Sequence, residues 1–328
     1  MKIAGYIAGF LGLVLLLILI VHSEFSESIE VLGIAGWQLF WLVPYRALFF
    51  VLYALGWRVL LGPYDPARRA GLGYLFWVTT LREAIDRLLP VASVGGSVIA
   101  VRLLRWRGLA GAPVAATVVV EILLTLVVSY LFALCGVAIL VELGYVSPKL
   151  STLVLGLLAF LPALIAIAVL LRFGSPFRRS QRLLHLLTGA NALAADALNL
   201  DDEVQATLRR GWGLCVAGAL QFAALLSGAF EVWFALTLFG HPVSAGDAVI
   251  LESLTQAVRL VAFIVPAALG VQEAALVLFG QALGIGSELA LAVSIAKRMR
   301  EVLCALPSLL SWQWLEARQI RLQLRMPS

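Results

Sequence analysis

Charged residues are scarce in this chain. Asp, Glu, Lys and Arg make up 13% of its 328 residues, whereas 62% are hydrophobic and the mean hydropathy is +0.99. A typical soluble domain has about 25% charged residues. Cys135, Cys215 and Cys304 stand in apolar runs without the spacing of a metal or redox motif. The composition predicts an all-α, polytopic transmembrane helical bundle with no metal site and no cofactor.

The few polar motifs also argue against an enzyme. Lipid phosphatases need histidines beside basic residues, but His22, His185 and His241 fall in predicted loops or in a surface segment. Metal-dependent lipid transferases need clustered Asp, and the pair at 201–202 stands alone. No glycine-rich phosphate loop follows a strand, because no strand is predicted.

Three uncharged runs are long enough to cross a bilayer, at residues 3–21, 122–141 and 150–171. Each reaches the roughly 20 residues that span about 30 Å of hydrocarbon. The first run lacks a small-residue cleavage site, so we interpret it as a retained span and not as a signal peptide. The absence of an alternating ten-residue pattern makes a β-barrel an unlikely architecture.

The loops sort by charge along the chain. Basic clusters occur around Arg68, Arg105 and Arg178 and in the tail near Arg318, whereas Glu24 and Glu27 follow the first predicted span. The positive-inside rule then predicts a multi-pass membrane protein with both termini in the cytoplasm. Because the basic clusters are short and flank spans, the net charge of +5 favours anionic lipid headgroups over nucleic acid.

The same pass along the chain predicts two membrane halves, at residues 1–175 and 209–328. Residues 31–57, with several aromatics at their head, predict an outer-surface element leading into a span that ends near Arg58. Residues 176–208 are too polar to cross, and their leucines alternate with polar residues. They predict an amphipathic helix on the cytoplasmic face that links the halves.

One charged stretch stands out at residues 79–102. Its four charges directly precede a helix break and are Arg82, Glu83, Asp86 and Arg87. The break contains Pro90, Gly95 and Gly96. Four unpaired charges facing lipid would cost on the order of 10 kcal/mol, so these side chains must be paired, hydrated or at the membrane surface. Helical spacing predicts that Arg82 faces Asp86 and that Glu83 faces Arg87.

The second half repeats this outline. Arg259 precedes a break at Pro266 and Gly270, at nearly the same distance as Arg82 precedes its own. The charge bias predicts that one broken hairpin enters from the cytoplasm and the other from outside, which would make the halves inverted repeats with re-entrant hairpins. Broken helices at matching positions indicate a binding site within the membrane. The alternative is that both segments are merely kinked spans.

A resemblance rests on three stretches. They are R-E-A-I-D-R-L-L-P-V-A-S-V-G-G-S-V-I-A-V-R at 82–102, P-A-A-L-G-V-Q-E at 266–273 and R-M-R-E-V-L at 298–303. They resemble the flippase-like integral membrane family that includes the transmembrane part of the lysylphosphatidylglycerol synthases. The first stretch and residues 46–58 are similar to its branch associated with hopanoid biosynthesis. The resemblance implies movement of a lipid between leaflets, with an anionic or aminoacylated headgroup or a hopanoid-type lipid held in a polar cavity. Only a short tail follows the last predicted span, so synthesis of a modified lipid is not expected.

The transport hypothesis gives each intramembrane charge a role. Arginine forks would bind a phosphate, because their geometry matches it bidentately, and the carboxylates would hold those arginines when the site is empty. Glu121 is deep in its span and is expected to be a partner or a proton-coupling carboxylate. Lys297 and Arg300 are similarly deep. The predicted substrate-binding residues are Arg82, Arg87, Arg259, Arg298, Glu83, Asp86, Glu252, Gln256, Glu273, Glu121 and Glu301.

Two alternatives remain open at this point. The cluster from Arg82 to Arg87 also fits two surface salt bridges on an amphipathic helix at the cytoplasmic interface, since charged runs are usually solvated. The whole protein also fits a scaffold that recruits lipid-modifying enzymes, in which the segment 176–207 matters and Arg259 does not. Membrane lipids are the expected ligands, and a homodimer and lipid-biosynthetic enzymes are the protein partners left open.

Overall fold

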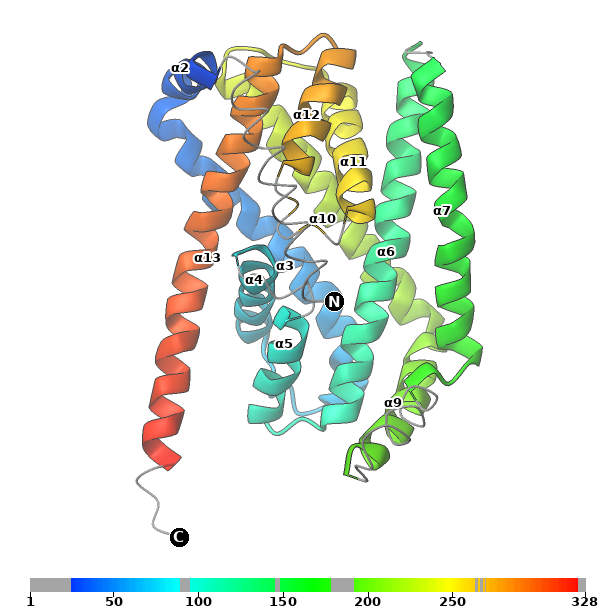
Figure 1. Ribbon diagram of the computed structural model, residues 1–328. Coiled ribbons are helices and arrows are strands. Elements are labelled where there is room, and N and C mark those ends of the chain that lie inside the picture. The colour runs from blue at the N-terminus through cyan, green and yellow to red at the C-terminus, as the bar shows by residue number, and fades with distance from the viewer. Residues whose placement is uncertain are drawn as a thin grey trace.

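The computed structural model describes residues 25–88, 95–144, 148–177, 192–262, 265, 268 and 270–323. Within these ranges the regular structure is helical throughout, without a strand (Figure 1). The first predicted span, at residues 3–21, lies outside the described residues, as do Pro90 and Pro266 of the two breaks.

Long helices form the frame of the bundle. They are α3 (Leu42–Leu61), α6 (Gly111–Glu142), α7 (Pro148–Phe173), α10 (Gly211–Leu238) and α13 (Ser287–Gln323). By length and composition, 30–64, 111–142 and 211–238 are long and apolar enough to cross a membrane. The predicted class of helical membrane protein is therefore confirmed, and the predicted span at 122–141 lies within α6. The predicted span at 150–171 lies within α7.

Two pairs of short helices lie inside this frame. The first pair is α4 (Leu72–Leu88) and α5 (Gly95–Trp106), and the second is α11 (Ala245–Val261) and α12 (Val271–Ala282). Both pairs consist of a 17-residue and a 12-residue helix. At 1.5 Å per residue these helices are about 25 and 18 Å long, too short to cross about 30 Å of hydrocarbon. Figure 1 shows the first pair in the lower half of the bundle and the second in the upper half.

Local chemistry explains why α4 and α5 meet so closely. The Oδ1 atom of Asp86 accepts a hydrogen bond from the backbone N–H of Gly96 at 3.0 Å, so the last turn of α4 caps the first turn of α5. A Cβ atom on Gly96 would lie 2.6 Å from the carbonyl oxygen of Arg82. Glycine is therefore required at residue 96, and the hydrogen bond of Asp86 goes to the backbone of α5.

The first residues of α11 and of α12 also show why each helix begins where it does. Ser244 and Asp247 form a reciprocal capping box at the start of α11. The chain turns into α12 at Gly270, whose φ of 73° is readily adopted only by glycine. Ala268, three residues after Val265 in the connecting segment, also has a positive φ of 49°.

Each short pair packs in its own hydrophobic core. The core around α4 and α5 contains Trp57, Leu75, Ile85 and Leu103, all nearly fully buried. The core around α12 instead joins it to α2 (Phe25–Ala35), the short 3-10 helix η1 (Gly36–Trp41), α10 and α13. Charged side chains from several helices form ion pairs in the region between these two cores.

The ends of the bundle carry different charges. The lower end in Figure 1 holds the connections on either side of α4 and α5 and the helix α9 (Ala192–Leu208). The described charges there include Arg58, Arg68, Arg69, Arg102, Arg105, Arg107, Arg172, Arg209 and Arg210, which outnumber the acids Asp65, Asp201, Asp202, Glu203 and Glu316. The upper end carries Glu142, Asp247 and Glu288 beside Lys149. Of the predicted amphipathic segment, residues 178–191 lie outside the described residues, and α9 packs Val204 and Leu208 against α6.

Candidate functional site

One turn of α13 carries four charged side chains in the interior of the bundle. They are Lys297, Arg298, Arg300 and Glu301, and their side chains are between 3% and 22% exposed. Such charges are tolerated at this depth only with partners or water. Successive helical residues point about 100° apart, so the four side chains reach different neighbouring helices.

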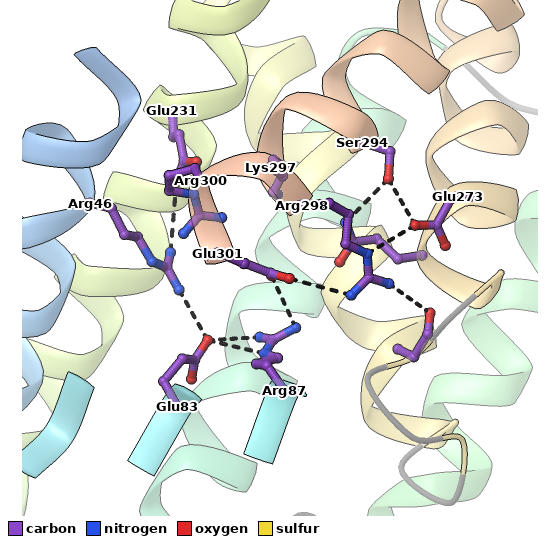
Figure 2. Close-up of polar contacts among 12 residues, drawn as sticks. Arg46, Glu83, Arg87, Glu231, Glu273, Ser294, Lys297, Arg298, Arg300 and Glu301 are labelled. Atoms are coloured by element: carbon purple, nitrogen blue, oxygen red, sulfur yellow. Dashed lines mark hydrogen bonds and ion pairs between the residues drawn. The ribbon is translucent and has the colours of Figure 1, made fainter. Parts of the chain in front are cut away.

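The centre of the site is a chain of ion pairs between α3, α4 and α13 (Figure 2). Glu83 accepts from Arg87 at 3.0 Å, which confirms the pairing predicted from their spacing. The same Glu83 oxygen lies 3.5 Å from Arg46 of α3. On its other side Arg87 reaches Glu301 of α13 at 3.4 Å. Glu83 and Arg87 thus connect the end of the first short pair to two long helices.

Glu231 of α10 closes one side of this chain. Its side chain is 1% exposed and pairs with Arg300 at 2.8 Å and with Arg46 at 3.7 Å. The guanidinium of Arg46 also lies 3.5 Å from the ring centroid of Phe49, in cation–π contact. The two arginines balance the charge of this buried carboxylate, which explains how α10 can hold an acid within its apolar length.

The other side of the chain reaches the second short pair. Arg298 pairs with Glu301 at 3.3 Å and with Glu273, in the first turn of α12, at 3.1 Å. Arg298 also donates to the backbone carbonyl of Ala268 at 3.3 Å, and Ser294 donates to Glu273 at 3.2 Å. The network of four arginines and four glutamates therefore runs without interruption from α3 to the break between α11 and α12.

Two further ion pairs fix the short pairs to the long helices that follow them. Arg82 of α4 binds Glu121 of α6 at 2.6 Å and lies 5.1 Å from the ring centroid of Trp57. Lys297 of α13 binds Glu252 of α11 at 2.5 Å. The cation is on the short helix in the first pair and on the long helix in the second. Arg82 forms its ion pair with Glu121 and not with Asp86, whose carboxylate caps α5, although the charges of Arg82 and Asp86 still attract each other.

A pocket of about 300 Å³ lies between the end of α4, the middle of α6 and the end of α11. Its wall combines the end of α4, the polar face of α6 and the end of α11 with the segment after it. The lining residues are Asp86, Arg87, Thr125, Ser129, Gln256, Arg259, Leu260, Ala262, Val265 and Ala268. The pocket therefore combines two arginines and a few polar groups with an apolar wall.

The two arginines of the pocket differ in their surroundings. Arg87 is held by Glu83 and Glu301. Arg259 is half-buried and makes no ion pair with any residue in the described part of the chain. A guanidinium at this depth that protein carboxylates leave uncompensated is suited to bind an anion.

The predicted site residues thus separate into three groups. Arg87, Asp86, Gln256 and Arg259 line the pocket. Glu83, Glu273, Arg298 and Glu301 belong to the network beside it. Arg82, Glu121 and Glu252 form the two separate ion pairs, and Gly95, Gly96 and Gly270 lie at the ends of the short helices.

Sequence reasoning missed Arg46 and Glu231 as members of the network. The aromatic residues around Arg46 suggested a surface element, but Arg46 is 7% exposed and deep in the bundle. The signal that could have found both residues is the one used for Arg82, a charge within an otherwise apolar helix. No group of three or more possible metal ligands occurs among the described residues.

Comparison with known families gives a clear match. The model of the lysylphosphatidylglycerol synthase transmembrane region matches residues 5–308. The chain belongs to this family. No curated protein sequence and no solved structure is similar enough to count as a match.

Family membership confirms the resemblance seen in the sequence and identifies a membrane protein related to lipids. Residues 5–308 include both short pairs and the whole ion-pair network, so the match covers the candidate site. The similarity to the hopanoid-associated branch stays a prediction, because the family model does not distinguish branches.

Proposed function

We propose that this protein moves an anionic lipid between the leaflets of the bacterial inner membrane and is not itself an enzyme. The observation that carries the proposal is the pocket at Arg259, because it offers a guanidinium without an ion pair among the described residues, a second arginine, two hydroxyl groups and an amide within a lipid-related membrane protein. A phosphate held there would accept charge-assisted hydrogen bonds from Arg259 and Arg87.

The proposal includes a route for the acyl chains. A groove of about 490 Å³ lies between α3, α4 and α13, and apolar residues such as Val43, Phe76 and Pro307 dominate its wall. It shares Phe50, Thr80 and Cys304 with a small gap at the ion-pair network. The groove would receive an acyl chain while the headgroup is in the polar interior.

The network would act as the closed barrier on this route. Arg87 lines both the pocket and the small gap, and it is held by Glu83 and Glu301. A phosphate would compete with these carboxylates for Arg87, so its arrival would loosen the link between α4 and α13. Exchange of one anionic partner for another avoids a bare charge within the membrane.

We further propose that the two halves are inverted repeats, with α4–α5 and α11–α12 as re-entrant hairpins that enter from opposite sides. Equal helix lengths, the placement of the pairs in opposite halves of the bundle and the ion pair from each to its following long helix support this arrangement. The arginine-rich lower end would face the cytoplasm under the positive-inside rule.

Transport is tested with purified protein in vesicles that contain fluorescent phosphatidylglycerol, with a membrane-impermeant quencher outside. Arg259→Gln is expected to slow transbilayer exchange about 10–100-fold, because a hydrogen bond to a charged group contributes about 1.5–3 kcal/mol. Arg209→Gln is the matched control, since it removes the same charge from an exposed position outside the pocket. Equal rates in wild type and Arg259→Gln would overturn the site assignment.

The scaffold hypothesis predicts a different result. A scaffold would show no exchange above that of protein-free vesicles, for wild type as well as for Arg259→Gln. Cells carrying Arg259→Gln would then have normal lipids, whereas replacement of the α9 segment would alter them. Exchange by wild type that Arg259→Gln slows excludes this alternative.

A further inference from the structure

A second pocket lies at the lower end of the bundle, separate from the ion-pair network. Its volume is about 540 Å³. It is formed by the last turns of α3, the turn that follows them and one residue of α10. The lining residues are Leu55, Arg58, Val59, Leu61, Gly62, Asp65, Pro66, Arg68, Ala70 and Leu220, none of which lines the pocket at Arg259.

The pocket has an apolar wall and a charged rim. Leu55 and Val59 are one helical turn apart on α3, and Leu220 faces them from α10. Arg58 and Arg68 supply the positive charge, and neither makes an ion pair with a residue in the described ranges. An apolar wall beside two arginines suits an anion that carries an apolar chain better than a small soluble anion such as phosphate.

The turn that carries Arg68 is held by Asp65. The two carboxylate oxygens of Asp65 accept from the backbone N–H groups of Arg69 and Ala70, each at 2.8 Å. Arg68 has a φ of 51°, a left-handed conformation that non-glycine residues rarely adopt. The acid in the pocket is thus engaged with backbone, and the turn presents the side chain of Arg68 at the pocket rim.

The position of the pocket fits the boundary between headgroups and acyl chains. Trp212, at the start of α10, is 83% exposed, as is common for tryptophan at a membrane interface. Leu220 is eight residues, or about 12 Å along the helix axis, further into the bundle on α10. The pocket therefore extends from the charged end of α3 into the depth occupied by acyl chains.

We propose that this pocket binds one anionic phospholipid as a resident lipid, with its phosphate on Arg58 and Arg68 and an acyl chain along Leu55, Val59 and Leu220. The net charge of the lining is positive even with Asp65 counted, so an anionic lipid is favoured over a zwitterionic one. This lipid would seal α3 against α10 and is distinct from the transported one.

Lipid-dependent thermal stability of the purified protein in micelles tests the proposal. Phosphatidylglycerol is expected to raise the unfolding temperature of wild type more than phosphatidylcholine does, and glycerol phosphate is expected to have no effect. The double variant Arg58→Gln/Arg68→Gln is expected to require about 10–100-fold more phosphatidylglycerol for the same protection. Arg209→Gln, which removes an exposed arginine outside the pocket, is expected to behave as wild type.

A second variant keeps the test decisive if the double variant folds poorly. Leu220→Trp would fill the apolar wall while both arginines remain, so phosphatidylglycerol bound to the purified protein, counted by native mass spectrometry, is expected to fall. Undiminished protection in the double variant, equal protection by phosphatidylcholine or protection by glycerol phosphate would each overturn the proposal. None of these outcomes depends on transport, so failure of the transport hypothesis leaves this one standing.

Discussion

The ion pair between Lys297 and Glu252 allows the sharpest test of how this bundle tolerates buried charge. The two side chains are 3% and 9% exposed, and their charged atoms are 2.5 Å apart. Neither residue lines the pocket at Arg259. A change in stability here is therefore expected to reflect the pair itself.

Removal of either partner leaves the other charge buried and uncompensated. Lys297→Met and Glu252→Met are each expected to lower the free energy of unfolding by about 3–5 kcal/mol. The double variant Lys297→Met/Glu252→Met removes both charges and keeps similar side-chain volume. It is expected to lie within about 1.5 kcal/mol of wild type, because a well-packed apolar pair replaces a desolvated ionic one.

Equilibrium unfolding in mixed micelles measures all four proteins of this double-mutant cycle. The coupling energy is expected to be at least about 3 kcal/mol. The control cycle uses Arg102 and Glu316, which are 3.0 Å apart but 57% and 19% exposed. There we expect about 1 kcal/mol or less. Similar small couplings in both cycles would refute the reasoning that burial makes the inner pair costly to break.

Three further predictions concern the close contact at Gly96, the buried carboxylate of Glu231 and the orientation of the bundle in the membrane. Gly96→Ala should destabilise the protein by about 1–3 kcal/mol in the same unfolding assay, because the new Cβ would press on the Arg82 carbonyl; Gly73→Ala, with open space around it, is the control. Glu231→Gln should cost about 3–5 kcal/mol by leaving Arg46 and Arg300 without their shared carboxylate, and unchanged membrane yield and stability would contradict this. In a protein without native cysteines, Ala67→Cys should react with an impermeant thiol reagent only from the cytoplasm and Pro242→Cys only from outside. Labelling of both positions from the same side would rule out the proposed orientation.

Sequence patterns predicted the elements of the fold better than their contacts. Hydropathy identified the long helices, because a span must be apolar for about 20 residues whatever it packs against. The spacing of Glu83 and Arg87 predicted their pairing, since both lie on one helix face. Arg82 has the same spacing from Asp86, but the two form no direct ion pair, because Glu121 of another helix binds Arg82 and the N–H of Gly96 binds Asp86.

The location of the charged network was harder to predict for a physical reason. Depth in the membrane depends on where a helix begins and on how it tilts, and neither is encoded in the residues next to a charge. Arg46 has aromatic neighbours that are equally suited to the membrane surface and to a cation–π contact in the interior. Only the carboxylates of α4 and α10 distinguish these cases, and they lie far away in the sequence.

The charged turn of α13 has a consequence for how this molecule can move and diversify. Its four charged side chains form ion pairs with four different helices: Lys297 with α11, Arg298 with α12, Arg300 with α10 and Glu301 with α4. A rotation of α13 about its axis would break all four ion pairs together. Conformational changes are therefore expected to move the other helices relative to a stationary α13. Substitutions of these four residues would be tolerated only together with matching substitutions of their ion-pair partners.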